Sequence, residues 1–513
     1  MTRVPFRACA LLLSLSPSAC AAAFTPPELG GAAWVEGTSP NFVLYTDLPE
    51  PDARDALRTL ERSYTMLAEV AFPSTRQPPR TRIIHFQRSA EYEVIAPPQT
   101  GGYFTTVFDL DEGTEPLAVT YGDLSSEPKR RSVQHELTHR FVSYYYPKAP
   151  PWLNEGLAEY FETMTVEGDE IVLGLPAFQV HLQADPFSPR ISLADVPSVR
   201  AVFALEGSAF LPGSEELFGT TTLKRAVAAR AGAWALVHML KNGPELYRRR
   251  FDDFVALLQQ GLAVSSTDEL SSLNPDTFED DFRDWLFPFT QGGSVVRRGR
   301  YEEKDVSIEG VRPMSPAEVH LLWAALRPEQ VEAEIEAALR FEPGSWRARL
   351  RRARLHEKQG SEAAAEQDFE GALAQSEGRP ECVLALLGFH ARRSQAPASG
   401  RSKERAEALL AKLPVRRFSV SEQEGLARSL ALLGRPGEAL QFARRAVDGD
   451  PSCWRCYDTL ARIHAVRGEF DEATITQSLA IERLPHGLGG RGMLDRLATY
   501  EKAATAERKK GNR

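Results

Sequence analysis

Three side chains able to bind a metal or move a proton stand together in the segment His135-Glu136-Leu137-Thr138-His139. On a helix, residues four positions apart lie one above the other on one face, so His135 and His139 are predicted to direct imidazole nitrogens at a single ion. Glu136 would lie beside that face, within reach of a water molecule on the metal. Because the chain has only 10 histidines in 513 residues, this spacing rarely arises by chance. The segment therefore predicts a metal site with an adjacent general base.

A second segment, Pro151–Tyr160 with the sequence PWLNEGLAEY, offers the carboxylates that such a site needs. A catalytic zinc ion takes three protein ligands and keeps one position open, and two histidines with one carboxylate are a known set. Glu155 is predicted to be the third ligand. Glu159 follows four residues later and is predicted to accept a hydrogen bond from the far nitrogen of a ligating histidine. The segment Pro147–Pro151 would reverse the chain between the two helices.

Together these segments resemble the gluzincin metallopeptidases, in which a glutamate of an Asn-Glu motif on the next helix completes the metal site. The phrase Trp-Leu-Asn-Glu-Gly is most similar to aminopeptidase N-like enzymes and to the bacterial peptidase MA-like proteins. The resemblance extends loosely from Trp34 to Thr290. It implies that His135, His139 and Glu155 bind Zn²⁺ and that Glu136 activates water.

The implied reaction is hydrolysis of a peptide or protein substrate. Zinc lowers the pKa of its water and polarises the scissile carbonyl, while Glu136 takes the proton and returns it to the leaving amine. The spacing between His139 and Glu155 is shorter than in the aminopeptidases, and no Gly-x-Met-x-Asn strand for a free amino terminus is present. We therefore expect an endopeptidase rather than an aminopeptidase.

The group that stabilises the oxyanion stays unassigned in the sequence. The helical segment Arg225–Leu240 offers Arg230 and His238 but no tyrosine, and the apolar neighbours of His238 indicate a core histidine. Packing is also expected for His181 and for the run Tyr144–Tyr146. The segment Leu117–Tyr121 is either an edge strand that pairs with an extended substrate or an ordinary strand of the sheet.

Two other functions remain open. The metal domain could be a catalytically silent zincin scaffold, with binding done by the rest of the chain, or the same zinc could hydrolyse a non-peptide ester or epoxide. An intact Glu136 favours an enzyme, because a scaffold needs the metal ligands but no general base.

The elements that must position these residues can be read from periodicity. Alternating or clustered β-formers predict several strands, and a helical spacing of apolar residues predicts one helix between the first two of them. The predicted strands are Asn41–Thr46, Thr81–Gln87, Tyr103–Phe108 and Leu117–Tyr121, and the predicted helix is Pro51–Val70. From Pro128, with Ser125 or Ser126 as N-cap, the chain is predicted to be largely helical to about Thr290. Residues 24–300 are therefore predicted to form an α+β domain, and the resemblance implies that it is a zincin-like metallopeptidase domain.

The segment 312–487 consists of similar units with a period of 34 residues, and one irregular unit near 380–416 is interrupted by Ser394–Arg401. Aligned glycines and alanines recur at Gly360, Gly434 and Gly468, at Ala365, Ala439 and Ala473, and at Ala372, Ala446 and Ala480. This pattern resembles the tetratricopeptide repeat, a helix–turn–helix unit with small residues where its helices cross. About five units are expected to stack into an all-α solenoid whose concave surface binds a protein partner, or that serves as a spacer. Residues 488–513 would form a capping helix, Leu494–Lys509, and a basic tail.

Composition excludes some classes of function. The chain has 61 Lys and Arg against 70 Asp and Glu, a net charge of -9, whereas nucleic-acid binders need clustered positive charge. The apolar share of 42% and the charged share of 26% are typical of globular proteins, and no run of residues is long and apolar enough for a transmembrane span. We expect neither a nucleic-acid partner nor a membrane-spanning anchor.

The first residues indicate export. Arg3 and Arg7 precede an apolar stretch, Ala8–Leu15, followed by small residues, which is typical of a secretory signal peptide over residues 1–23. The mature protein is expected in the periplasm or outside the cell. Lipoprotein anchoring through Cys20 is the less favoured alternative, because Pro17 stands where a lipobox has leucine.

Three cysteines remain beyond the leader: Cys382, Cys453 and Cys456. The last two form a CxxC pattern without the second pair that a zinc site needs. We expect them to be packing residues on a helix, with a disulfide in an oxidising compartment as the alternative.

Overall fold

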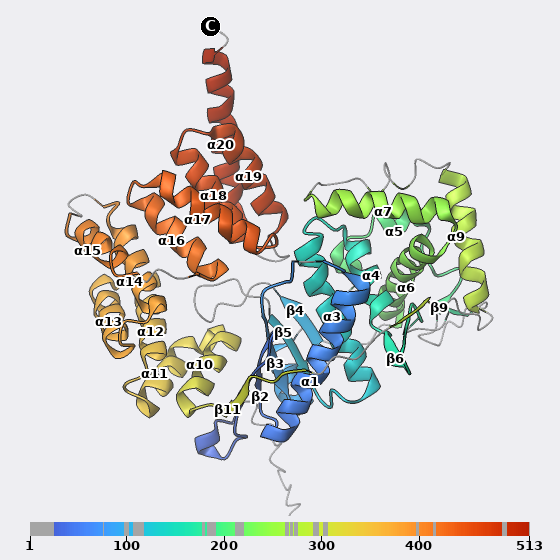
Figure 1. Ribbon diagram of the computed structural model, residues 1–513, viewed down its shortest axis with the longest axis horizontal. Coiled ribbons are helices and arrows are strands. Elements are labelled where there is room, and N and C mark those ends of the chain that lie inside the picture. Colours follow the sequence, from blue (N-terminus) through green and yellow to red (C-terminus); the bar gives the residue numbers. More distant parts are fainter. Residues whose placement is uncertain are drawn as a thin grey trace, which may run out of the picture.

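The computed structural model describes residues 25–74, 76–96, 102–105, 117–176, 180–181, 191–210, 220–261, 266, 270, 275–290, 297–300, 306–396, 400–413, 417–484 and 490–511. A part built on a β-sheet is joined to a curved array of helices, and the two lie against each other (Figure 1). The predicted leader, residues 1–23, and Cys20 lie outside the described residues. No helix in the described ranges is both long and apolar enough to cross a bilayer.

The main sheet has six strands in the order β11-β1-β2-β3-β5-β4. Their bounds are Val35–Thr38 (β1), Phe42–Thr46 (β2), Thr81–Phe86 (β3), Gly102–Thr105 (β4), Leu117–Tyr121 (β5) and Gly310–Pro313 (β11). The central strands β2, β3 and β5 are parallel, and β1, β4 and β11 pair antiparallel with their neighbours. The four predicted strands are confirmed to within a few residues, except that residues 106–108 of the third lie outside the described ranges. The strands β1 and β11 were not predicted, because Glu36 and Gly37 in β1 and Gly310 and Pro313 in β11 are residue types that strands disfavour.

Alternation along the strands divides the sheet into two apolar faces. Ile83 and Ala118 point to one core, and their neighbours Ile84 and Val119 point to another. The first core is covered by α1 (Glu50–Met66) and α3 (Glu127–Tyr145), and the second by α2 (Ser89–Ile95) and α10 (Pro316–Leu326). Since α10 is the first helix of the array, the repeats complete the core of the sheet.

Further helices extend the first core beyond α3. They are α4 (Pro151–Phe161), α5 (Val199–Phe203), α6 (Thr220–Asn242), α7 (Glu245–Gln259) and α9 (Pro275–Thr290). The chain after α4 is less helical than predicted, because it also forms two small sheets. In one, β10 (Arg297–Arg300) pairs with a hairpin of two strands, and the other has two strands. The strands are Thr165–Glu167 (β6), Glu170–Leu173 (β7), Val180–His181 (β8) and Ile191–Ser192 (β9).

The C-terminal part is a helical solenoid of tetratricopeptide type. Consecutive helices pack as five hairpins: α10 with α11 (Val331–Phe341), α12 (Trp346–Lys358) with α13 (Glu362–Gln375), α14 (Pro380–Arg393) with α15 (Gly400–Leu410), α16 (Val420–Leu432) with α17 (Pro436–Gly449), and α18 (Trp454–Val466) with α19 (Phe470–Glu482). The predicted capping helix is α20 (Arg491–Gly511), whose end projects from the body (Figure 1).

The repeat alignment holds at the level of single residues. Gly360, Gly434 and Gly468 each follow the first helix of a hairpin with φ between +77° and +80°, the left-handed conformation that favours glycine at a helix end. All six aligned alanines are fully buried at 0% exposure. A larger side chain at these positions would separate the paired helices.

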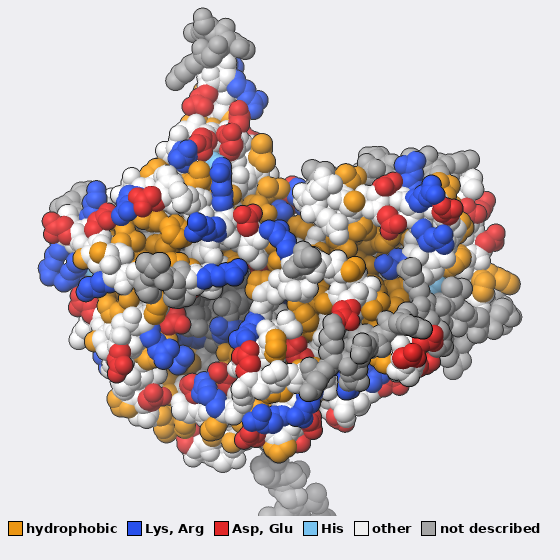
Figure 2. Space-filling model, in the orientation of Figure 1, with side chains coloured by type: hydrophobic (Ala, Val, Ile, Leu, Met, Phe, Trp, Pro, Cys, Tyr) orange, Lys and Arg blue, Asp and Glu red, His pale blue; other side chains and the backbone are white. Residues whose placement is uncertain are grey.

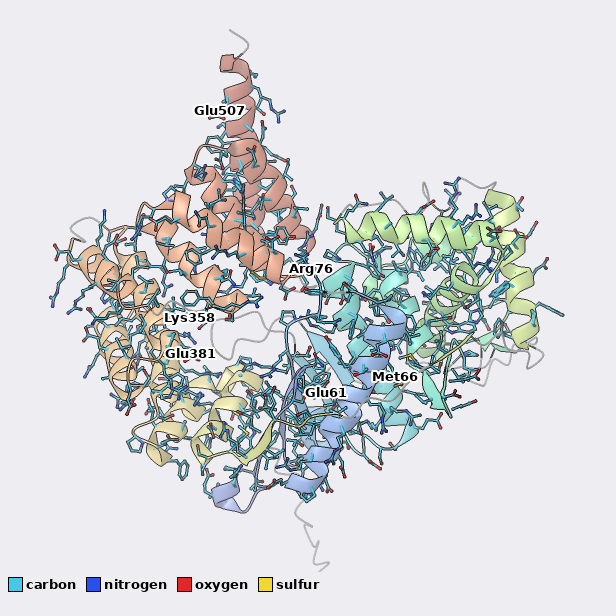
Figure 3. The ribbon with its side chains drawn as sticks, in the orientation of Figure 1. Glu61, Met66, Arg76, Lys358, Glu381 and Glu507 are labelled. Carbon is cyan, nitrogen blue, oxygen red and sulfur yellow. A yellow bond between two sulfur atoms is a disulfide. The ribbon has the colours of Figure 1, made fainter. Side chains whose placement is uncertain are left out.

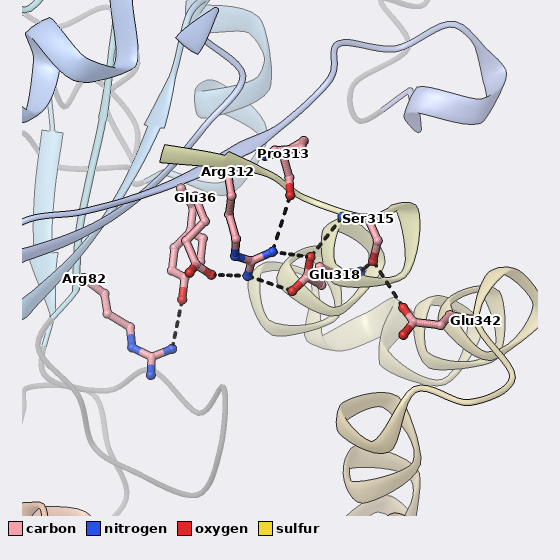
Figure 4. A network of polar contacts seen from close by, with 8 residues as sticks. Glu36, Arg82, Arg312, Pro313, Ser315, Glu318 and Glu342 are labelled. Carbon is pink, nitrogen blue, oxygen red and sulfur yellow. Dashed lines mark hydrogen bonds and ion pairs between the residues drawn. The ribbon is translucent and has the colours of Figure 1, made fainter. Parts of the chain in front are cut away.

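Arg312 on β11 ties the sheet to the first repeat (Figure 4). Its guanidinium donates to both oxygens of Glu318 on α10, at 2.9 and 2.8 Å, and to Glu36 on β1 at 2.8 Å. The same Glu318 accepts from the backbone N–H of Ser315, closing a capping box at the start of α10. The beginning of the array is therefore anchored on the sheet.

The far end of the array also reaches the first part of the chain. Arg140 on α3 is 1% exposed and lies 3.9 Å from Asp450, which follows α17. Burial lowers the pKa of Arg140, and Asp450 opposes that shift. Lys148, just after α3, pairs with Glu482 of α19 at 2.7 Å. Both ends of the solenoid are thus attached to the sheet-containing part.

The expectation that the CxxC residues only pack was wrong. Cys453 and Cys456 are joined in a disulfide at the start of α18, and both are buried as well. The three-residue spacing across the first turn of a helix brings the two sulfur atoms together. Cys382 is free and buried.

We predict that Asp450→Asn lowers the free energy of unfolding by about 3 kcal/mol, because it leaves the buried charge of Arg140 without a counter-ion. Asparagine keeps an oxygen for the bond that Asp450 accepts from the Ser452 backbone. Replacing both partners, Arg140→Met with Asp450→Asn, should restore most of the loss. Urea unfolding of the unaltered protein, the two single variants and the double variant measures this double-mutant cycle. If Asp450→Asn and the double variant lost the same free energy of unfolding, the predicted ion pair would be contradicted.

Candidate metal centre

The predicted metal ligands come from two adjacent helices, α3 and α4. His135, Glu136 and His139 lie on α3, and Glu155 lies on α4. The helices run in opposite directions, because the start of α4 contacts His139 while the residue after its end, Glu162, contacts His135. Their packing brings three of the four predicted residues to one point.

The Nε2 atoms of both histidines face the carboxylate of Glu155. His135 Nε2 is 3.7 Å from Glu155 Oε2, and His139 Nε2 is 3.7 Å from Glu155 Oε1. Two zinc ligands at bond lengths of about 2.0–2.1 Å and tetrahedral angles lie about 3.4 Å apart. Each histidine is therefore spaced from Glu155 like a pair of zinc ligands, within a few tenths of an ångström, and all three ligand atoms lie within 4.8 Å of one another.

The remaining ring nitrogens are held by acceptors. His135 Nδ1–H donates to Glu162 at 2.8 Å, and His139 Nδ1–H donates to the side-chain oxygen of Asn154 at 3.1 Å. Because both partners accept, the lone pairs are on the two Nε2 atoms that face Glu155. The buried Glu155 Oε2 has no hydrogen-bond partner among the described residues. These features fit a bound cation.

The prediction that Glu159 accepts the hydrogen bond of a ligating histidine was wrong, because Glu162 takes that place. Glu162 holds His135, and Glu159, 4% exposed, instead lies 3.6 Å from Arg230 on α6. Both carboxylates share the helix face of Glu155, since Glu159 follows it after one turn and Glu162 after two. The position of α4 along the axis of α3 then decides whether Glu159 or Glu162 contacts His135.

Burial governs the charges of the site. It lowers the pKa of His135, and His139 adds to that shift, which favours the neutral imidazole that can bind a metal. Burial also raises the pKa of Glu159 and of Glu162 to about 7. Burial alone would lower the pKa of Arg230, but the surrounding carboxylates, Glu159 foremost, outweigh it and raise that pKa.

Arg230 and His238, the two residues of α6 that were considered as oxyanion stabilisers, lie in different places. Arg230 reaches Glu159 at the candidate site, and its Nε donates to the backbone oxygen of Phe210 at 3.2 Å. His238 is fully buried, accepts a hydrogen bond from Trp285 Nε1 at 3.1 Å and packs among aromatic rings. The prediction of a core histidine is confirmed, and Arg230 is the cation that faces the site.

Other expected packing residues follow the prediction where they are described. Tyr144 and Tyr146 are buried, and the partly buried Tyr145 stacks on Phe72. The side chain of His181 lies outside the described residues.

The strand beside Glu136 is β4 rather than β5. The segment Leu117–Tyr121, which we considered as a substrate-pairing edge, is β5, and it is covered on both sides by β3 and β4. Among the described strands, β4 is the edge strand at this end of the sheet, and β11 is the edge strand at the other end. A Cβ atom on its Gly102 would lie 3.4 Å from Glu136 and 3.1 Å from Ser132 Oγ, so β4 runs directly along α3.

Three residues of this site were not among the predicted ones: Asn154, Glu162 and Gly102. Asn154 could have been recognised from its place before Glu155, and Glu162 from its position two turns further on. Gly102 carried no signal in the sequence, because only the pairing of β4 with β5 brings it to α3.

Gly156, next to Glu155, is where α4 meets α6. A Cβ atom at this position would lie 2.5 Å from the backbone oxygen of Ala233 and 2.7 Å from Val237. No flexible side chain could move aside to relieve the first contact, so the two helices would have to separate. The glycine of the Asn-Glu-Gly phrase therefore sets how deeply Glu155 is seated.

Comparisons with known proteins bear on the repeats. No protein-family model matches the sequence, and no curated protein is significantly similar to it. Among solved structures, a thermophilic tetratricopeptide-repeat protein of Thermus thermophilus is 21% identical over 37% of this chain and 97% of its own, with a TM-score of 0.30. PilW, a type IV pilus biogenesis factor, is 21% identical over 37% of this chain and 92% of its own, with a TM-score of 0.28. Likenesses this remote say nothing about what the chain binds.

We predict that Gly156→Ala lowers the free energy of unfolding by about 1–3 kcal/mol, because the added methyl group overpacks the contact between α4 and α6. The matched control is Gly425→Ala in α16, where a Cβ atom meets nothing within 4 Å. That change should be neutral or stabilising by up to about 1 kcal/mol. Urea unfolding measures both, and equal effects would contradict the packing argument.

We further predict that Glu162→Ala weakens zinc binding by about 10–100-fold, because His135 loses the acceptor that orients it. Glu127→Ala, an exposed change at the start of the same α3, serves as control and should bind zinc like the unaltered protein. Competition with a zinc-sensitive dye measures both affinities. An unchanged affinity in Glu162→Ala would show that Glu162 does not orient a ligand.

Proposed function

We propose that this protein is an exported zinc-dependent peptidase of gluzincin type. The observation that carries the proposal is the convergence of His135 Nε2, His139 Nε2 and the Glu155 carboxylate, with both Nδ1 atoms already bound by acceptors. An open coordination position beside Glu136 would complete a catalytic rather than a structural site.

In this mechanism each residue has a distinct task. His135, His139 and Glu155 hold the metal, while Glu162 and Asn154 fix the histidine rings. Zinc held there supplies a Lewis acid that acidifies water and polarises a carbonyl group. Glu136 accepts a proton from the attacking water and passes it to the leaving amine.

Substrate positioning follows from the edge strand. The outer side of β4 is free of other described strands, and β4 passes beside Glu136. An extended peptide that pairs with this edge would run along α3, with its main chain held by strand hydrogen bonds. Arg230 would place a positive charge at the same site, where it could stabilise the oxyanion that forms on the carbonyl.

A catalytically silent scaffold with a protein-binding repeat array is the second candidate. The observation that favours it is that the repeats are part of the fold, because α10, the first repeat helix, covers one face of the sheet. Glu136 separates the two candidates, because a scaffold makes no use of a general base beside the metal ligands.

The test is cleavage of a peptide library by the mature protein with zinc supplied, read by mass spectrometry. Glu136→Gln should keep one zinc per chain and lose cleavage by a factor of about 10²–10⁴, because the general base is gone. Glu127→Gln, on the same helix, is the control and should cleave normally. A protein that binds zinc but cuts no peptide would support the scaffold, and equal cleavage by Glu136→Gln would reject the assigned base.

A further inference from the structure

A cleft separates the end of the repeat array from the part of the chain that carries the metal centre. It consists of two adjoining cavities of about 670 and 800 Å³, which share Arg76 and Tyr144 in their walls. One wall comes from α3, α7 and the segment around Arg76, and the other from α16, α17 and α18 and from Arg483, which follows α19. Figure 3 shows Arg76 between the two parts.

The cleft is basic in an acidic protein. Its walls carry five cationic side chains, Arg76, Lys241, Arg417, Arg445 and Arg483, but only two acidic ones, Asp252 and Asp448. The whole chain has a net charge of -9. Basic side chains also gather where the two parts meet on the face seen in Figure 2. The cleft thus concentrates positive charge that the chain as a whole lacks.

Two of these arginines have no counter-ion among the residues that the structure describes. Arg76 and Arg445 are exposed, and neither forms an ion pair within the described ranges of the chain. Other arginines of the array are matched to carboxylates, such as Arg352 to Asp368 and Arg392 to Glu357. The cleft therefore presents charges that an external anionic group could pair with.

The walls between the arginines are apolar. Phe418, Phe442, Val420 and Pro79 line the larger cavity, and the Arg445 guanidinium lies 5.8 Å from the centre of the Phe442 ring. A small anion would have no use for these surfaces. A nucleic acid would need cations at the regular spacing of its phosphates, which a chain of net charge -9 with two unpaired arginines in the cleft does not offer.

We propose that this cleft binds an extended acidic segment of a protein partner. Arg76 and Arg445 pair with its carboxylates, while Phe418 and Phe442 receive its apolar side chains. The cleft lies at the end of α3 that carries Tyr144, beyond the metal ligands, so binding there is independent of the proposed peptidase activity. The same segment could hold a partner whether or not that partner is cut.

The test uses the full chain with Glu136→Gln, so that the probe is not degraded. The probe is a short fluorescein-labelled peptide in which glutamates alternate with leucine and phenylalanine, followed by fluorescence anisotropy. Arg76→Glu and Arg445→Glu should each weaken binding at least tenfold, and binding should fall as salt rises. The matched control is Arg444→Glu, an exposed neighbour on α17 outside the cleft, which should bind as before.

Several results would overturn the proposal. They are no binding of the peptide at millimolar concentration, the same loss in Arg444→Glu, or equal binding of a peptide with lysines in place of the glutamates. Equal binding of a DNA oligonucleotide of the same charge, lost in the same variants, would show a general polyanion site instead. Binding that persists after zinc is removed separates this proposal from that of the peptidase. Matching thermal midpoints of the variants exclude unfolding as the cause.

Discussion

The contact between α3 and α4 is the constraint on which the candidate site depends. Three ligand atoms meet only if His135, His139 and Glu155 stand at matching heights on two antiparallel helices. The close approach of α4 to α6 at Gly156 sets one side of that arrangement, and the sheet beneath α3 sets the other. The geometry of the centre is therefore a consequence of helix packing, because protein interiors leave little room to shift a helix.

The repeats pack on the same sheet that lies beneath α3. Because α10 covers one face of the sheet, the chain would expose Ile84 and Val119 without its first repeat. At the far end, Asp450 contacts Arg140, the residue that follows the second histidine of the site. The array is therefore held at both ends, and the cleft between the two parts has a defined width. A partner bound in the cleft would meet a surface built from both.

The electrostatics of the two candidate regions are opposite. The candidate metal centre gathers Glu155, Glu159 and Glu162 around two histidines and one arginine, which suits a cation. The cleft gathers arginines with few carboxylates, which suits an acidic partner. Each arrangement is local, and neither follows from the net charge of the chain. The net charge of a sequence conceals such local clusters of charge, because residues from distant segments form each cluster.

The sequence by itself determined the features that depend on local spacing. The i, i+4 histidines, the Asn-Glu phrase and the 34-residue period identified α3, α4 and the repeats, because helical periodicity links neighbours along the chain. Even single residues could be assigned this way, since the six aligned alanines are all buried.

Only the tertiary structure decided which residues meet across elements. It placed Glu162 rather than Glu159 on His135, made β4 rather than β5 the edge of the sheet, and joined Cys453 to Cys456. It also brought the first repeat onto the sheet. These contacts depend on the relative height of two helices, the order of strands and the docking of distant segments. Local periodicity carries no information on such relations, because it describes one element at a time.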